Sequence, residues 1–145
     1  MNIFIGADHR GFELKNAIIE YLHEKNIRIE DLGAYEYNGE DDYPDFSQKV
    51  AQAVLQNSEN YLGIVICGSG CGVTIATNRF KGIRAGIAMN ENQAAHIREN
   101  DHANVLSLAS DYTDIETAKK IVDTFLASSP KTEKKYLRRI EKLDK

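Results

Sequence analysis

The feature that most constrains this chain is a regular alternation of short apolar runs with amphipathic segments of helical period. Five apolar runs have the length of buried strands, at 3–6, 27–32, 62–67, 83–89 and 105–109. Six segments carry apolar residues at helical spacing, at 12–25, 45–56, 70–80, 91–100, 114–127 and 133–143. Strands that alternate with helices pair in parallel, because each connecting helix packs on the sheet. The sequence therefore predicts an α/β fold with a five-stranded parallel sheet, helices on both faces and an extra C-terminal helix.

The length and composition fit a single domain over residues 1–145. Apolar residues make up 42% of the chain and charged residues 28%, as in ordinary globular domains. No apolar stretch approaches the roughly 20 residues of a membrane span, and no basic segment precedes an apolar one at the N-terminus. We expect a cytoplasmic protein that does not enter a membrane, with Cys67 and Cys71 as reduced thiols.

Charge is unevenly distributed along the chain. Residues 131–145 hold seven Lys or Arg and three Asp or Glu, whereas the rest of the chain is acidic and the net charge is −4. An acidic body repels phosphate backbones, so we expect no nucleic-acid partner. Lys135, Arg138 and Arg139 fit two interpretations: a cluster that binds the phosphate of a small ligand, or the solvated face of a terminal helix.

A glycine-rich loop is the strongest local motif. Residues 67–72, Cys-Gly-Ser-Gly-Cys-Gly, end a buried run and open a predicted helix. The glycines at 68, 70 and 72 let successive backbone N–H groups point into one concavity, where a helix N-terminus favours an anion. A dinucleotide-binding fingerprint would need Gly at 73, where Val stands. The loop predicts an anion site, and the alternative is a simple tight turn.

Cys67 lies where a thiol is activated, at a strand end and before a set of amides that favour the thiolate. It fits a catalytic base or a nucleophile, and the alternative is a small buried hydrophobic residue, as free cysteines usually are. Cys67 and Cys71 lack the spacing of zinc ligands, and no suitably spaced pair of histidines follows, so we predict no metal site.

Polar residues gather at two further positions. Asp8 and His9 follow the first apolar run between two glycines, as in a binding loop; alternatively, Asp8 caps the first helix and His9 is a surface residue. His102 lies in a polar cluster that leads into the fifth predicted strand. The segment 33–44 is long and acidic, and either borders a site at the carboxyl edge of the sheet or is a solvated excursion.

Several of these motifs occur in the same order in a known family. They are Gly-Ala-Asp-His-Arg-Gly-Phe-Glu-Leu-Lys (6–15), Asp-Tyr-Pro-Asp-Phe (42–46), Cys-Gly-Ser-Gly (67–70), Ile-Ala-Thr-Asn-Arg (75–79), Gly-Ile-Arg-Ala (82–85) and Ala-Asn-Val-Leu (103–106). Over nearly the whole chain they resemble ribose-5-phosphate isomerase type B, a family that also contains the galactose-6-phosphate isomerase subunits. The resemblance implies a Rossmann-like three-layer fold, a homodimer or dimer of dimers with sites near the subunit interface, a sugar-phosphate substrate, and neither metal nor organic cofactor.

The resemblance also implies roles for individual residues in an aldose–ketose isomerisation, which moves a proton between C2 and C1 through a cis-enediolate. Family members take the base from a cysteine before the glycine loop or from a glutamate after it, and this chain has Cys67 and Val73 at those positions. Among the other matched positions, Gly68, Ser69, Gly70 and Gly72 would stabilise the enediolate, and Ser69 would also assist proton transfer. Asp8 and His9 match residues of the substrate site, and Lys135 and Arg139 match residues that bind the phosphate.

Two positions depart from the family pattern. Asn100 occupies the place of the usual ring-opening histidine, and Asp111 stands where many members have an arginine. We hypothesise that His102 opens the sugar ring, because imidazole exchanges protons near neutral pH. The alternatives are that His9 opens the ring, or that the enzyme uses the small open-chain fraction of the sugar in solution. Asn100 and Asp101 are expected to contact substrate.

The expected function is the interconversion of ribose 5-phosphate and ribulose 5-phosphate, a step of the pentose phosphate pathway. Two alternatives remain: isomerisation of another aldose 6-phosphate, such as that of allose or galactose, and non-catalytic binding of a sugar phosphate. The combination of Asp8, His9, Cys67 and Ser69 favours an enzyme, because a binding protein has no need of a thiol base.

Overall fold

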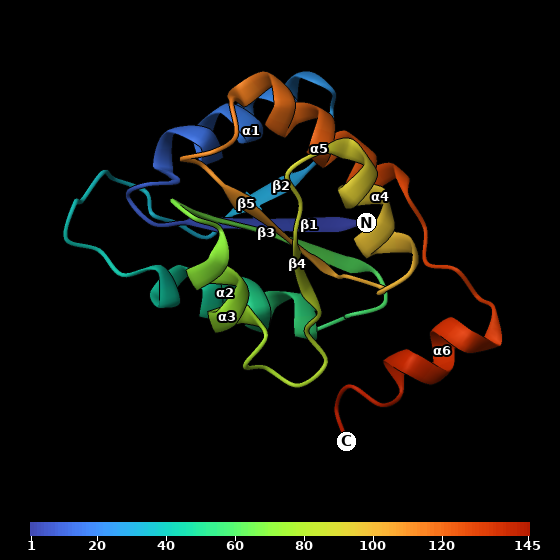
Figure 1. Cartoon of the computed structure of the whole chain (residues 1–145). Coiled ribbons are helices and arrows are strands. Elements are labelled where there is room, and N and C mark those ends of the chain that lie inside the picture. Colours follow the sequence, from blue (N-terminus) through green and yellow to red (C-terminus); the bar gives the residue numbers. More distant parts are fainter.

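The computed structural model describes residues 1–145, the whole chain, as five strands and six helices. The strands are β1 (Asn2–Ala7), β2 (Ile29–Asp31), β3 (Tyr61–Cys67), β4 (Ala85–Ile87) and β5 (Val105–Ala109). The helices are α1 (Phe12–Glu24), α2 (Tyr43–Leu55), α3 (Cys71–Thr77), α4 (Glu91–Glu99), α5 (Ile115–Ala127) and α6 (Lys134–Ile140). All strand pairs are parallel, in the order β2-β1-β3-β5-β4, which confirms the predicted sheet (Figure 1). No helix has the length and apolar character needed to cross a membrane.

Helices cover both faces of the sheet. Alternate residues of a strand point to opposite faces, so the sheet contributes to two apolar clusters. The larger cluster packs Ile5 and Ile64 with residues of α1, α4 and α5, and the smaller one packs Phe4 and Val65 with residues of α2 and α3. The same division is visible in Figure 1, with α1, α4 and α5 above the sheet and α2 and α3 below it. The predicted three-layer, Rossmann-like arrangement is confirmed.

Several elements are shorter than the sequence predicts, among them β2, at 29–31 rather than 27–32, and α6, at 134–140 rather than 133–143. The helix expected over 70–80 ends as α3 before Asn78, whose side chain bonds both the N–H and the C=O of Ala85 and so turns the chain toward β4. The strand expected over 83–89 is reduced to β4, an edge strand that pairs with β5 alone.

Two side chains differ from the predicted helix faces. Lys15 in α1 is fully buried, and its Nζ donates to Asp31 Oδ2 at 2.7 Å and to Asn16 Oδ1 at 3.1 Å. Ile115 fits the helical spacing of apolar residues in the segment predicted over 114–127, but it is the first residue of α5 and is 44% exposed. The helical period of apolar residues predicts the burial of neither residue correctly, because burial depends on what packs opposite each side chain.

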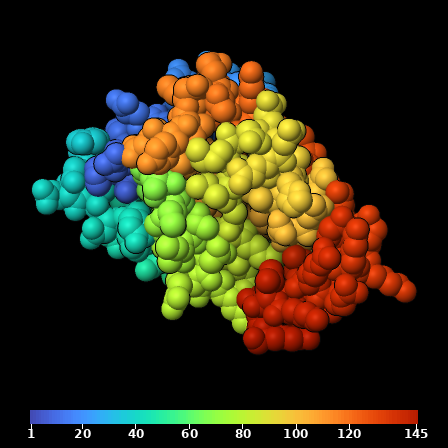
Figure 2. Space-filling model, in the orientation of Figure 1, coloured from blue at the N-terminus to red at the C-terminus, as the bar shows by residue number.

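The C-terminal helix α6 lies outside the three layers. None of its residues is buried, and Leu137 keeps 43% of its surface exposed. In Figure 1 the red C-terminal segment lies on the side where β1 begins, and Figure 2 shows it at the periphery of the molecule. Its attachment includes a bond from the Gly82 N–H to Asp144 Oδ2 at 3.0 Å. The apolar face of α6 is therefore without a full covering in the single chain.

Candidate active site

Three loops meet at the carboxyl edge of the sheet. Because β3 lies between β1 and β5 and all three are parallel, the segments 8–11, 67–72 and 110–111 emerge side by side. Backbone bonds tie the second and third loops together, with the Asp111 N–H donating to the carbonyl of Gly68 at 3.0 Å. This edge holds Asp8, His9, Cys67 and the glycine loop, as the sequence predicts.

The glycine loop presents backbone N–H groups that have no acceptor in the chain. Those of Gly68, Ser69, Gly70 and Gly72 make no hydrogen bond to protein, whereas the Cys71 N–H donates to Ser69 Oγ at 3.1 Å. Gly70 has φ +72°, a backbone conformation that favours glycine, and a Cβ there would lie 2.6 Å from Cδ1 of Ile87, which would have to move. The unpaired amides of the loop, rather than the short seven-residue helix α3, provide the donors for an anion.

Cys67 lies beneath this loop. Its side chain is 4% exposed and belongs to the apolar cluster on the α2 and α3 face, while Cys71 is exposed on α3, and neither cysteine forms a disulfide. The chain has no group of three or more His, Cys, Asp or Glu side chains arranged to hold a metal ion. Cys67 is thus the last residue of β3 and directly precedes the unpaired amides in the chain.

Asp8 anchors the loop that follows β1. Its Oδ1 accepts hydrogen bonds from the N–H groups of Arg10 at 3.0 Å and Gly11 at 3.1 Å. Burial raises the pKa of Asp8, because the charged form loses hydration, and the two amides oppose that rise. The N-cap of α1 is Gly11 rather than Asp8, so the interpretation of Asp8 as a helix cap is wrong.

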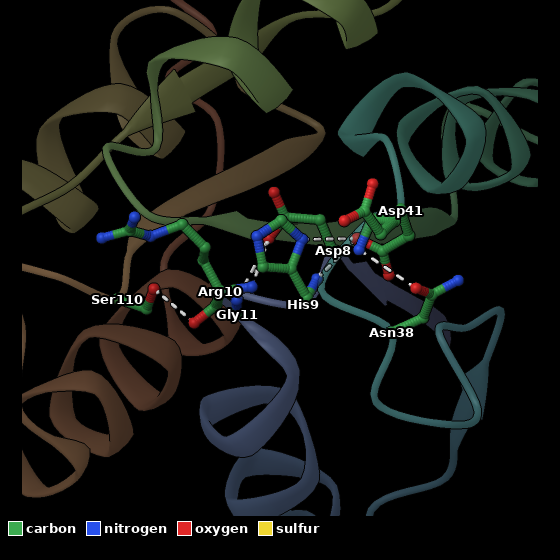
Figure 3. Close-up of polar contacts among 8 residues, drawn as sticks. Asp8, His9, Arg10, Gly11, Asn38, Asp41 and Ser110 are labelled. Carbon is green, nitrogen blue, oxygen red and sulfur yellow. Dashed lines mark hydrogen bonds and ion pairs between the residues drawn. The ribbon is translucent and has the colours of Figure 1, made fainter.

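His9 is held by the long loop that follows β2. Its Nδ1 lies 2.7 Å from Asp41 Oδ1, and the same oxygen accepts the His9 backbone N–H at 2.8 Å (Figure 3). The hydrogen bond to Asp41 raises the pKa of His9. The loop therefore borders the site, as one of the two interpretations proposed. Asp41 itself was not predicted as a site residue, and the only signal in the sequence was the acidic character of the loop.

A second ion pair spans the β1 and β5 loops. The guanidinium of Arg10 contacts the carboxylate of Asp111, and Ser110 Oγ donates to the Arg10 carbonyl at 2.8 Å. The pair lies against Gly68, where a Cβ would be 2.7 Å from Arg10 Nε and 2.8 Å from Asp111 Oδ2. Asp111, which stands where the resemblance leads us to expect an arginine, is thus paired with a cation from the neighbouring loop.

The other predicted residues lie at the opposite edge of the same chain. Asn100, Asp101 and His102 connect the end of α4 to the start of β5, and a helix that returns to a parallel strand must end at its amino edge. The backbone of His102 has φ +52°, and its Nε2 lies 2.8 Å from the carbonyl oxygen of Lys131. The single chain does not bring these residues to Cys67.

Lys135 and Arg139 share one side of α6, four residues apart, and α6 also lies away from the carboxyl edge (Figure 1). Both side chains are exposed. Their assignment to the phosphate, like that of His102 to ring opening, stays a prediction.

Comparisons with known proteins cover almost the entire chain. Residues 3–143 match the Ribose/Galactose Isomerase family. The chain is 46% identical over 143 residues to the probable ribose-5-phosphate isomerase B of Mycoplasma genitalium, which spans 98% of this chain and 93% of that protein. The crystal structure of the Mycoplasma genitalium enzyme with bound ribulose-5-phosphate aligns with a TM-score of 0.94 at 44% identity, covering 98% of this chain and 93% of that one. A ribose 5-phosphate isomerase from Thermotoga maritima aligns with a TM-score of 0.93 at 40% identity, over 99% and 97% of the two chains.

Proposed function

Since the chain belongs to the ribose/galactose isomerase family, we propose that it interconverts ribose 5-phosphate and ribulose 5-phosphate through a cis-enediolate, with Cys67 as the base. It is an aldose–ketose isomerase with a place in the pentose phosphate pathway. The observation that carries the assignment of the site is the row of unpaired amides that directly follows Cys67 in the chain. A thiol base next to an anion site is what a proton transfer through an enediolate requires.

The proposed reaction starts from the open-chain aldose. The Cys67 thiolate takes the proton from C2, the electron pair forms the C1–C2 double bond, and negative charge develops on O1. Amides aimed at such an oxygen stabilise the transition state, and removal of one donor typically costs about 100- to 1000-fold in turnover. Ser69 accepts from the Cys71 N–H, so its own O–H is free to move a proton between O1 and O2. The thiol then returns the proton to C1.

We also propose that a second copy of the chain completes the site. Lys135, Arg139 and His102 lie at the edge opposite to Cys67, and the apolar face of α6 lacks a full covering. A homodimer, or a dimer of dimers, in which α6 reaches the neighbouring carboxyl edge would bring two cations to the phosphate and bury Leu137. The two free cysteines agree with a cytoplasmic location.

The experiment that tests the function is a turnover assay on ribose 5-phosphate beside allose 6-phosphate and galactose 6-phosphate, without added metal. We expect the highest kcat/KM with ribose 5-phosphate. A higher value with either hexose phosphate would reassign the substrate. Binding of sugar phosphate without turnover of any of the three would identify a non-catalytic sugar-phosphate binding protein.

The base is tested by two matched cysteine substitutions. Cys67→Ala should lower kcat on ribose 5-phosphate by about 100- to 10,000-fold, because general-base catalysis contributes that much. Binding of the sugar phosphate, measured by calorimetry, should persist, because the predicted phosphate and hydroxyl contacts are unchanged. Cys71→Ala is the control and should retain turnover, because Cys71 is exposed on α3. Turnover near the wild-type rate in Cys67→Ala would remove Cys67 from the mechanism.

A further inference from the structure

Asp41 holds His9 by two contacts to a single oxygen. Asp41 Oδ1 accepts the His9 backbone N–H at 2.8 Å and lies 2.7 Å from His9 Nδ1. The two residues are 32 positions apart and come from different loops, so only the folded loop over 33–42 creates this contact. Figure 3 shows the imidazole of His9 joined to Asp41 on one side. The ring is therefore fixed in one orientation.

The second oxygen of Asp41 indicates that this carboxylate is not there for stability alone. The Asp41 side chain is 10% exposed, and its Oδ2 is buried with no hydrogen-bond partner. An unpartnered buried carboxylate oxygen opposes folding, so it calls for another explanation. The ring of Tyr37 stands edge-on to His9 at 6.3 Å between centroids and forms a wall on the side of the loop. The carboxylate of Asp41 is thus largely shielded from water, and its contacts are with His9.

The contact determines which nitrogen of His9 is available. A ring nitrogen bonded to a carboxylate carries the proton, so Nδ1–H donates to Asp41 and Nε2 is left for chemistry. Nε2 of His9 has no hydrogen-bond partner within the chain, whereas Nε2 of His102 lies against the carbonyl of Lys131. Side-chain exposure of His9 is 26%, which leaves the ring accessible to a ligand.

We propose that Asp41 is a positioning residue that makes His9 the proton carrier for opening the furanose ring of the substrate. This rests on the proposed function, since ribose 5-phosphate is largely cyclic and must open before Cys67 can act. In the step, the C1–O4 bond breaks and its electron pair stays on O4, which takes the proton from His9 Nε2. The O1–H bond pair completes the C1–O1 double bond, and the proton of O1 passes to the now neutral Nε2. His9 ends in the form in which it began.

The charges that face His9 agree with this role. Asp41 on the facing loop and Asp8 on the same loop favour the imidazolium, and Arg10 opposes it. The pKa of His9 is raised, first by the hydrogen bond to Asp41, so more of the ring is protonated near neutral pH and able to donate to O4. Replacing Asp41 by an uncharged residue removes that bias and frees the ring to rotate.

Ring opening can be measured apart from isomerisation. In a Cys67→Ala background the enediolate step is blocked, and ring opening and reclosure appear as faster magnetisation exchange between the α and β anomers of ribose 5-phosphate by NMR. Addition of Asp41→Asn should reduce this acceleration by about tenfold or more, because acid–base catalysis contributes about 100- to 10,000-fold and Asp41 supplies part of it by positioning His9. It should also move the basic limb of the pH profile of the exchange to lower pH. Glu40→Gln, an exposed neighbour on the same loop, is the matched control and should leave the exchange rate unchanged.

A second measurement keeps a folding defect apart from the proposed role. With Cys67 intact, incorporation of deuterium from D₂O at C1 of ribulose 5-phosphate reports the enediolate step on a substrate that does not cyclise. Asp41→Asn should retain this incorporation while losing anomer exchange. In a His9→Ala background, Asp41→Asn should cause no further loss, because the two residues act as a unit.

Several results would overturn the proposal. One is an anomer-exchange rate that Asp41→Asn leaves unchanged, and another is a loss of deuterium incorporation as large as the loss of anomer exchange. A further loss of anomer exchange when Asp41→Asn is added to His9→Ala would also contradict it, as would a loss of anomer exchange caused by His102→Ala. The proposal would also be overturned if the Cys67→Ala protein did not accelerate anomer exchange while the wild-type protein isomerises ribose 5-phosphate. If the wild-type protein isomerises neither pentose phosphate, it is the proposed function that fails, which is a separate result.

Discussion

The buried ion pair between Lys15 and Asp31 should respond very differently to the loss of each partner. The Lys15 side chain is fully buried and the Asp31 side chain is 30% exposed, with 2.7 Å between Nζ and Oδ2. Asp31→Ala leaves a buried ammonium with one remaining acceptor, Asn16 Oδ1. Lys15→Met removes the buried charge, fills a similar volume, and leaves a carboxylate that water reaches and that still accepts the Gly33 N–H.

The magnitudes follow from burial. Removal of one partner of a buried pair costs about 3–5 kcal/mol. Because water partly reaches Asp31, we expect Asp31→Ala to cost about 3 kcal/mol, at the lower end of this range. Replacement of a buried cation by an apolar residue of similar volume is close to neutral, so Lys15→Met should cost about 1 kcal/mol or less. With an unfolding entropy of about 2.1 cal/mol/K per residue over 145 residues, these costs lower Tm by about 10 °C and about 3 °C.

Thermal and urea unfolding of both variants would test the difference, with agreement of two spectroscopic probes as the check on two-state behaviour. The control is Glu116→Ala, because Glu116 Oε1 lies 3.1 Å from a lysine, Lys119, but the Glu116 side chain is 80% exposed. Glu116→Ala should shift Tm little, since exposed pairs contribute little. Equal losses in Lys15→Met and Asp31→Ala, or a larger loss in Lys15→Met, would refute the reasoning.

Three further outcomes are expected. Gly70→Ala should lose about 2–4 kcal/mol in the free energy of unfolding, measured in urea, because a side chain at positive φ is strained and its Cβ would overlap a β4 side chain; kcat should fall as well, and a stable, fully active variant would show that the loop does not need glycine. The pKa of His9 is raised in the folded state, so its contact with Asp41 stabilises the fold below the unfolded pKa of about 6.5 and loses this effect as pH rises through the folded pKa. The Tm difference between wild type and Asp41→Asn should therefore be larger at pH 6 than at pH 9. A larger difference at pH 9 would contradict this sign. Replacement of both Lys135 and Arg139 by Ala should raise KM for ribose 5-phosphate more than it lowers kcat, since phosphate held equally in ground and transition states contributes uniform binding; unchanged kinetics would show that the two charges are only solvated.

The contacts at the site fall into two groups, those between residues close in the sequence and those between residues far apart in it. Ser69 and Cys71 are two residues apart, and their contact belongs to a loop that can be identified from its glycines. Arg10 and Asp111 are 101 residues apart, and their contact depends on β1 and β5 both lying beside β3. No periodicity in the sequence encodes that order of strands, because each strand alone is only an apolar run.

The position of His102 illustrates the same limit. Its place before the fifth predicted strand was correct, yet its proposed role requires it to be near Cys67, at the end of a strand. Because α4 runs back to the amino edge before β5 begins, the two residues lie at opposite edges of one chain. Only an assembly of chains could bring them together, and a single sequence carries no direct signal of one.

The alternation of strands and helices, the parallel sheet, and the placement of Asp8, His9 and Cys67 at one edge can be predicted from the amino-acid sequence. These properties follow from local period and from the rule that parallel strands end together. The tertiary structure alone decided that Lys15 is buried against Asp31 and that Asp41 orients His9. Those contacts join residues from separate loops and layers, and their energies come from desolvation and charge in the packed state, which no local pattern of side chains records.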